Sequence, residues 1–191
     1  KGIRDNRSHW YIQGHIGSTW KDGQYFRSRD IQYVRPAFED LLQRLQTDYI
    51  DFGFIHCLDE ESDLHTYEKN GILNYIMDLR SQGVVKYIGL STHAPELANK
   101  VLDMNILDMM MFSINPMYDF GQGDFAIGGT NERLDLYRRC EKEGVGISVM
   151  KPFNAGQLLD AAKSPFHQAL TPAQCIQYAL DKPGVLTVLG G

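Results

Sequence analysis

GVVKYIGLSTH, residues 83–93, is a short apolar run, centred on residues 87–90, that ends on polar side chains. Five further runs share this form, each closed by polar residues or by glycine: residues 10–16, 49–55, 109–114, 146–150 and 185–189. Because short apolar runs bounded by turn residues are typical of strands, we predict six strands. The inner four are nearly all apolar, which indicates strands buried on both faces.

Segments with helical spacing of apolar residues separate these strands. We expect helices at residues 30–46, 66–81, 95–105, 131–143 and 171–182. In the first of them, Pro36 marks a kink or a late start. Residues 116–130 are instead long and Gly-rich, which predicts a lid, a binding loop or disorder. Strands that alternate with helices indicate a parallel sheet.

The composition is that of an ordinary soluble globular domain. The chain has 191 residues, 43% of them hydrophobic and 23% charged, with a net charge of −5. No linker or repeat divides it, so we predict one domain over residues 1–191. Basic residues are scattered and no apolar stretch approaches about 20 residues, so neither nucleic acid nor a membrane is an expected partner. Three distant cysteines without a CxxC pair favour a reducing, cytoplasmic setting without a metal site.

Six strands fit two architectures. A (β/α)8 barrel closes with eight strands in roughly 250 residues, so about two β-α units are unaccounted for. Since the chain begins at Lys1, without a signal remnant, we interpret it as a fragment or a processed product. An open six-stranded parallel sheet is the alternative, and the pattern alone does not exclude it. In a barrel, the residues that close the strands would form the active site.

Four segments, in order, carry a family resemblance: LQTDYIDFGFIHCLD (residues 45–59), GVVKYIGLSTH (83–93), MKPFNAGQL (150–158) and GG (190–191). They resemble the aldo-keto reductases, which are NAD(P)H-dependent (β/α)8 oxidoreductases. The resemblance runs from the third strand of the family to the eighth and implies a barrel without about its first two β-α units. YIQGHIGS (11–18) and MFSINP (111–116) are similar to a bacterial branch that often carries an iron–sulfur region after the barrel. An iron–sulfur cluster is therefore implied only for a longer chain.

The resemblance implies reduction of a small aldehyde or ketone by hydride transfer. In the family a tyrosine gives the proton, a lysine paired with an aspartate lowers the tyrosine pKa, and a histidine orients the carbonyl. His56 occupies the histidine position, and His15 stands where the lysine is expected. A histidine can be charged or neutral near pH 7, so His15 would replace the lysine's field only in part. The aspartate and the tyrosine would fall before Lys1, which implies no turnover by these residues alone.

The cofactor, NADP or NAD, comes from the same resemblance. Ser91 matches the serine that holds the nicotinamide carboxamide, and Thr92 stands in place of the asparagine that follows it. Asn115 lies near the position at which the family makes a further hydrogen bond to the nicotinamide ring. A role as a turn former before Pro116 is equally expected. Lys151 and Gly156 lie where the loop after the seventh strand cradles the pyrophosphate.

Two other functions stay open. A binding or regulatory protein would keep the barrel without hydride transfer, which the substitution at His15 favours and the presence of His56, Ser91 and Lys151 opposes. A metal-dependent barrel hydrolase would use both histidines as ligands, but no HxH pair or bridging residue accompanies them.

Two tyrosines near the expected strand ends are candidates for lesser roles. Tyr25 and neighbouring aromatic residues fit either the wall of a substrate pocket or simple packing. Tyr118, in the long Gly-rich segment, is a further candidate proton donor.

Overall fold

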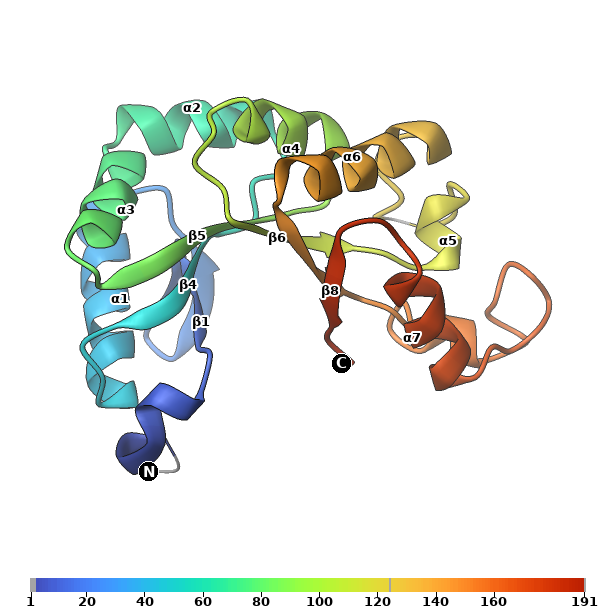
Figure 1. Cartoon of the computed structure of the whole chain (residues 1–191), viewed down its shortest axis with the longest axis horizontal. Coiled ribbons are helices and arrows are strands. Elements are labelled where there is room, and N and C mark those ends of the chain that lie inside the picture. The colour runs from blue at the N-terminus through green and yellow to red at the C-terminus, as the bar shows by residue number, and fades with distance from the viewer. Residues whose placement is uncertain (1–2, 124, 191) are drawn as a thin grey trace. The chain divides into compact units, whose positions relative to one another are not determined.

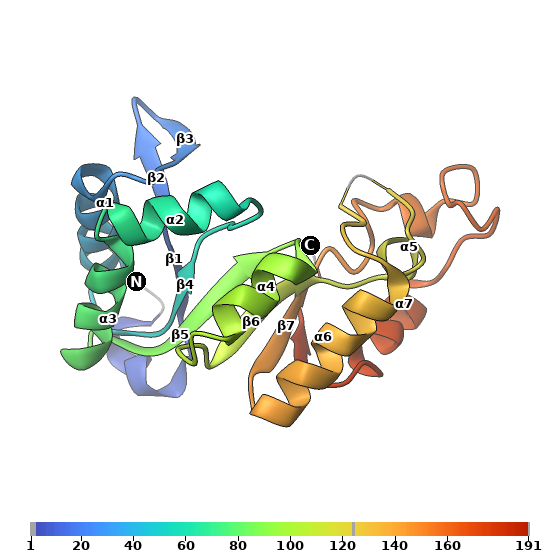
Figure 2. The same cartoon turned by 90° about the horizontal axis from the view of Figure 1, so that it is seen from above.

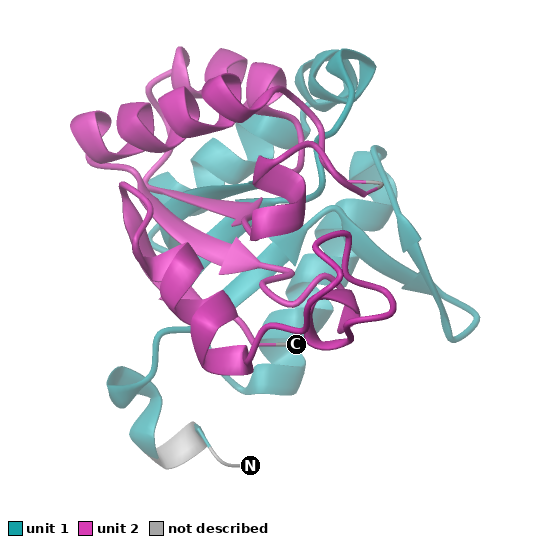
Figure 3. Cartoon of the chain, turned by 90° about the vertical axis from the view of Figure 1, so that its right-hand side faces the viewer, with its two compact units in different colours: residues 1–91 teal, residues 92–191 magenta. Residues whose placement is uncertain are grey.

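The computed structural model describes residues 3–123 and 125–190, in two compact units, residues 1–91 and 92–191 (Figure 3). Within each unit, three parallel strands alternate with helices, as the apolar runs predict. Gly191, expected at the end of the last strand, lies outside the described residues. In the part of the chain that is described, no helix is long and apolar enough to cross a membrane. A single domain over residues 1–191 stays a prediction.

Unit 1 pairs its parallel strands in the order β1, β4, β5. Its elements are η1 (Arg4–His9), β1 (Gln13–Ile16), β2 (Ser18–Lys21), β3 (Gln24–Arg27), α1 (Ile31–Leu45), β4 (Ile50–Ile55), α2 (Glu61–Lys69), α3 (Ile72–Ser81) and β5 (Val85–Thr92). Figures 1 and 2 show α1 and α3 along one side of β1 and β4. The antiparallel hairpin of β2 and β3 projects beyond the end of β1, as Figure 2 shows.

The helices of unit 1 follow local signals in the sequence. The Asp30 carboxylate accepts a hydrogen bond from the Gln32 backbone N–H at 2.9 Å and so caps α1. Pro36 lies inside α1, so this helix does not start late. The single helix predicted for residues 66–81 is wrong. Two helices, α2 and α3, meet at Gly71, whose φ of 72° is a left-handed conformation that interrupts a right-handed helix.

Unit 2 pairs its strands in the order β6, β7, β8, also in parallel. Its elements are α4 (Pro95–Leu102), β6 (Met109–Ser113), α5 (Pro116–Asp119), α6 (Thr130–Glu143), β7 (Gly146–Met150), η2 (Gln157–Leu159), α7 (Pro172–Leu180) and β8 (Val185–Val188). Helices α4 and α6 pack on each other. The Thr171 hydroxyl accepts from the Gln174 N–H and caps α7, within the helix range predicted for residues 171–182. Residues 116–130 are not wholly a loop, because they begin with α5.

A buried ion pair fixes the interior of unit 2. Arg133 of α6 is fully buried, and its Nε donates to Oδ1 of Asp119 at 2.9 Å. The other guanidinium nitrogens donate to the Ile127 carbonyl at 3.1 Å and to the last carbonyl of β6. The hydroxyls of Tyr137 and Tyr178 also donate to the Asp119 carboxylate. The pair therefore ties α6 to the end of β6 and to the segment between α5 and α6.

Candidate functional site

The parallel register of unit 1 sets one histidine against a buried aromatic ring. His15 of β1 aligns with Phe54 of β4, and Phe54 aligns with Gly89 of β5. Because aligned residues point to the same face, the His15 ring stacks on Phe54, with centroids 5.4 Å apart. A Cβ at Gly89 would lie 2.6 Å from the Phe54 ring. Glycine at this position therefore makes room for the ring that supports His15.

The second histidine, His56, is the first residue after β4 and bonds to the first. Nδ1 of His15 and Nδ1 of His56 lie 2.9 Å apart. Burial lowers the pKa of His15, while burial, His15 and the cations of Arg29 and Arg27 lower the pKa of His56 to about 4. Both rings are therefore neutral near pH 7. His15 contributes a hydrogen bond rather than the positive charge of a lysine.

Tyr25 completes this cluster. Its hydroxyl lies 2.6 Å from Nε2 of His56, and its ring meets the imidazole edge-on. Burial raises the pKa of Tyr25, although its side chain is about half exposed. The sequence left Tyr25 as either a pocket wall or a packing residue, and it did not predict this bond. The overlooked signal is the Asp22–Gly23 pair, which favours a tight hairpin and has positive φ at both residues.

The backbone around His56 is held from several directions. Its N–H donates to the Ile16 carbonyl at 3.1 Å, and the buried Tyr67 hydroxyl donates to that carbonyl at 3.0 Å. Gly17 has a φ of 110°, and a Cβ there would lie within 2.2 Å of the Tyr67 oxygen. Arg29 donates to the Cys57 carbonyl at 2.8 Å. These contacts fix the direction in which the His56 ring leaves the strand.

Ser91 and Thr92 close β5, and both are buried. Ser91 follows Leu90, which is the last residue of β5 that aligns with β4. The Ser91 carbonyl accepts a hydrogen bond from the Leu58 N–H at 3.0 Å. The Thr92 hydroxyl oxygen accepts from the Ala94 N–H at 3.1 Å, which forms the turn into α4. Ser91 belongs to unit 1 and Thr92 to unit 2. Their contact with a nicotinamide stays a prediction.

In unit 2, Asn115 links the ends of two strands. Its Oδ1 accepts from the Tyr118 N–H at 3.0 Å, so it caps α5. Its Nδ2 donates to the Lys151 carbonyl, just past β7, at 2.9 Å. The interpretation of Asn115 as a turn former is therefore confirmed, while its bond to a nicotinamide stays a prediction.

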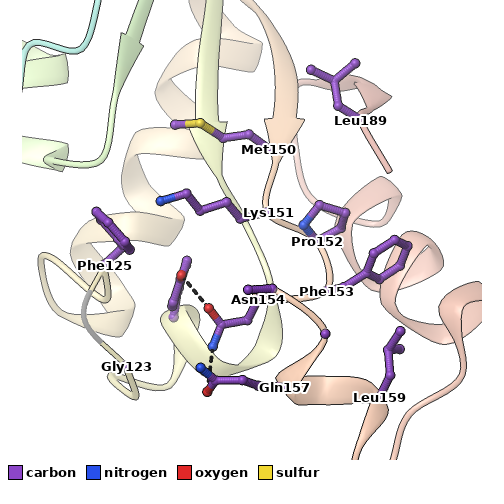
Figure 4. Close-up of a pocket in the computed structure, with 13 residues that line it drawn as sticks. Gly123, Phe125, Met150, Lys151, Pro152, Phe153, Asn154, Gln157, Leu159 and Leu189 are labelled. Carbon is purple, nitrogen blue, oxygen red and sulfur yellow. Dashed lines mark hydrogen bonds between the residues drawn. The ribbon is translucent and has the colours of Figure 1, made fainter. Parts of the chain in front are cut away.

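A pocket of about 620 Å³ opens beside these strand ends (Figure 4). Lys151 and Gly156, which the sequence assigns to the cofactor, both line this pocket. The Lys151 ammonium lies 3.1 Å from the ring centroid of Phe125. The Tyr118 ring meets Phe125 edge-on, and its hydroxyl donates a hydrogen bond to Asn154 at 2.5 Å. The pocket thus combines a cation, a small residue and an aromatic wall.

The chain folds around the pocket in an unusual conformation. Lys151, Asn154, Ala155 and Gly156 have φ values of 57°, 47°, 51° and 83°. Left-handed backbone is strained for residues with a Cβ, and such strain clusters at ligand sites. A Cβ at Gly156 would meet nothing within 4 Å, so its backbone faces open space. A cation beside open backbone is suited to a phosphate group.

Comparisons with known proteins show the family to which this chain belongs. The sequence model of the aldo/keto reductase family matches residues 16–174. An uncharacterized oxidoreductase, YqkF of Bacillus subtilis, is 27% identical over 211 aligned residues, which cover 99% of this chain and 66% of YqkF. The L-galactose dehydrogenase of Arabidopsis thaliana is 24% identical over 172 residues, which cover 88% of this chain and 49% of that enzyme.

Solved structures show the same fold. The aldo-keto reductase AKR11C1 from Bacillus halodurans superposes with a TM-score of 0.69 at 18% identity, over 97% of this chain and 64% of that one. Protein PA4992 of Pseudomonas aeruginosa gives 0.70 at 22% identity, over 99% of this chain and 64% of its own. The predicted barrel-type α/β fold is confirmed, and the chain spans no more than about two thirds of each relative's length. The family model matches residues 16–174, most of this chain, so the chain belongs to the aldo/keto reductase family of oxidoreductases.

Proposed function

We propose that the full-length protein reduces a small aldehyde or ketone with NADPH or NADH. The hydrogen-bonded pair of His15 and His56 at the strand ends of unit 1 carries this proposal. Family membership supports the class of reaction. An iron–sulfur cluster stays a prediction for a longer chain.

His56 assists the transfer of a proton to the carbonyl oxygen. The nicotinamide, when bound, supplies the hydride that the carbonyl carbon accepts. If His15 carries its hydrogen on Nδ1, it donates to Nδ1 of His56, and the neutral His56 ring then holds its own hydrogen on Nε2. In this tautomer the Nε2 hydrogen of His56 points toward the Tyr25 hydroxyl, 2.6 Å away, and at that position it would give the developing oxygen anion its proton. His15 is thus a positioning residue for His56.

Residues of unit 2 are proposed to bind the cofactor. The Lys151 ammonium neutralises one charge of the cofactor pyrophosphate. The open backbone at Gly156 lets a further phosphate oxygen come close to the chain. By the family resemblance, Ser91, Thr92 and Asn115 contact the nicotinamide. The charge, volume and open backbone of the pocket fit a pyrophosphate group.

The test uses the full-length protein and residues 1–191 side by side. We expect NADPH or NADH to bind and the full-length protein to reduce a simple aldehyde, while residues 1–191 alone give no turnover. His56→Ala should lower kcat by about 10²-fold or more, because general acid catalysis is lost. His65→Ala, at an exposed histidine of α2, is the matched control and should leave kcat unchanged.

Two results would contradict the proposal. Cofactor binding without turnover in the full-length protein would favour the alternative, a catalytically silent binding or regulatory protein. An unchanged kcat in His56→Ala would leave His56 as a structural residue at a strand end.

A further inference from the structure

Arg27 of β3 lies beside the cluster formed by His15, His56 and Tyr25. Tyr25 and Arg27 are alternate residues of one strand, so their side chains point to the same face of the hairpin. The Tyr25 hydroxyl lies 2.6 Å from Nε2 of His56. Nη1 of Arg27 donates to Sγ of Cys57, the next residue along the chain, at 3.1 Å. Two successive residues after β4 therefore hold two alternate residues of the hairpin.

The charge of Arg27 is not neutralised by a direct carboxylate partner. Arg27 is exposed, and among the described residues it forms no ion pair. The neighbouring Arg29 instead pairs with Asp63 at 3.0 Å and donates to the Cys57 carbonyl at 2.8 Å. Both histidines of the cluster are neutral near pH 7, because burial lowers the pKa of each ring. Arg27 is thus the cation that this cluster offers to an incoming molecule.

The contact with Cys57 leaves one edge of the guanidinium available. Nη1 of Arg27 is used by the thiol, whose own S–H donates to Oδ2 of Asp59 at 3.2 Å. The opposite edge carries the Nε and Nη2 hydrogens, side by side in the plane of the group. In the described part of the chain, neither of these nitrogens has a hydrogen-bond partner. Two parallel N–H groups match the two oxygens of a carboxylate.

The spacing along β3 sets the distance between the reacting carbonyl and this edge. The proposed function brings the carbonyl oxygen to Nε2 of His56, where the Tyr25 hydroxyl lies. Tyr25 and Arg27 leave the strand roughly 6–7 Å apart, because a strand rises about 3.3 Å per residue. A carboxylate bonded directly to the carbonyl carbon is too close to span this distance. A carboxylate separated from the carbonyl by two or three carbons can span it.

We propose that Arg27 binds a carboxylate at the far end of the substrate, so that the protein prefers aldehydes with a carboxylate two or three carbons from the carbonyl. The inference rests on the proposed reductase function and adds to it the class of substrate. In this role Arg27 does not contact the reacting carbonyl, and it determines specificity rather than catalysis.

The other cation of the hairpin belongs to the opposite face. Lys21 of β2 aligns with Gln24, which is one position before Tyr25 on β3. Because successive residues of a strand point to opposite faces, Lys21 does not share the face of Tyr25 and Arg27. Lys21 is also exposed, which makes it a matched control for the loss of one positive charge.

The experiment compares Arg27→Met with Lys21→Met in the full-length protein, with 4-oxobutanoate and its uncharged methyl ester as substrates. We expect the parent protein to prefer 4-oxobutanoate by about 10- to 100-fold in kcat/KM, because a charge-assisted contact binds the carboxylate alone. Arg27→Met should abolish this preference, mainly through KM, and Lys21→Met should keep it within about twofold. The ratio of the two substrates cancels any general effect of a substitution on folding or proton transfer.

A second readout is independent of turnover. Addition of 4-oxobutanoate should move the ¹⁵N signal of Arg27 Nε in the parent protein, and the methyl ester should leave it in place. Equal turnover of the two substrates by the parent protein would overturn the inference. A preference that survives in Arg27→Met, an equal loss in Lys21→Met or an unmoved Nε signal would overturn it as well. Absence of turnover together with a moved signal would instead overturn the proposed function and support the carboxylate site, which separates the two failures.

Discussion

The two units are built alike but end their strands in different chemistry. In unit 1 the strand ends carry imidazoles that bond to each other and to a phenol. In unit 2 the corresponding ends carry an amide, Asn115, and an ammonium, Lys151, beside a pocket of about 620 Å³. Under the proposed function, unit 1 moves a proton and unit 2 holds a charged group.

Burial acts differently on the charges of the two units. In unit 1 it lowers the pKa of His15 and His56, so that neither ring is charged near pH 7. In unit 2 the buried carboxylate of Asp119 instead lies 2.9 Å from the guanidinium of Arg133. A neutral ring can both donate and accept a proton, whereas a paired charge only holds its partners in place. The predictions that follow test this division, from the largest expected effect to the smallest.

The largest effect is expected at the buried ion pair of unit 2. Arg133→Met should lower the free energy of unfolding by about 3–5 kcal/mol, because the Asp119 charge would stay buried without its cation. Urea denaturation followed by circular dichroism measures this loss. Arg138→Met is the matched control, since Arg138 is exposed on the same helix and pairs with Asp135 at the surface. Its loss should stay below about 1 kcal/mol. Equal losses in the two variants would contradict the structural role of the buried pair.

Most of the fold could be predicted from the sequence, because buried strands consist of short runs of apolar residues. The six predicted apolar runs contain all the parallel strands of the described residues, to within a few positions at each end. Helix ends marked by capping residues, such as Asp30 and Thr171, were also predicted closely. The hairpin at residues 18–27 was missed because its aromatic residues are largely exposed, so no apolar alternation marks it.

The candidate site was only partly readable, since its contacts depend on register. His15 and His56 lie 41 positions apart in the sequence, and only the pairing of β1 with β4 brings their rings together. The lowered pKa of both rings depends on burial, which the residue types do not reveal. Lys151 and Gly156 were grouped by a motif, and they do line one pocket. The bond between Tyr25 and His56 depends on the three-dimensional path of the hairpin, of which the sequence marks only the turn at Asp22 and Gly23.

A smaller effect is expected at the pocket of unit 2. Lys151→Met should raise the Kd for NADPH by about 10- to 100-fold, because one charge-assisted contact with a phosphate contributes roughly 1.5–3 kcal/mol. The enhancement of nicotinamide fluorescence on binding measures this Kd. At saturating NADPH, kcat should change little, since no reacting proton is lost.

Lys163→Met is the matched control for the pocket. Lys163 is an exposed lysine of unit 2 that pairs with Asp160. An equal rise in Kd for both variants would show a general effect of charge on binding. An unchanged Kd in Lys151→Met would mean that the Lys151 ammonium does not contact a phosphate of the cofactor. The proposed difference in role between the two units would then be wrong.

The effect that is smallest at neutral pH, and grows only in acid, is expected from the titration of unit 1. His56 has a pKa of about 4 in the folded protein against an ordinary value of 6.5, set by burial, His15, Arg29 and Arg27, with Asp59 acting in the opposite direction. The folded state thus binds fewer protons than the unfolded state between these values. The contribution of His56 to stability is complete above about pH 6.5 and is lost as the pH falls toward about 4.

Unfolding free energies measured from pH 7 to 4 test this sign. We expect His56→Gln to lose less stability over this range than the parent protein, because glutamine has no proton to gain. Titration of the ¹⁵N shifts of the His56 ring should give a midpoint near 4. A midpoint near 6.5 would mean that the ring is charged in about a quarter of the molecules at pH 7. The chain of neutral hydrogen bonds from His15 to Tyr25 would then fail, and with it the assignment of proton transfer to unit 1.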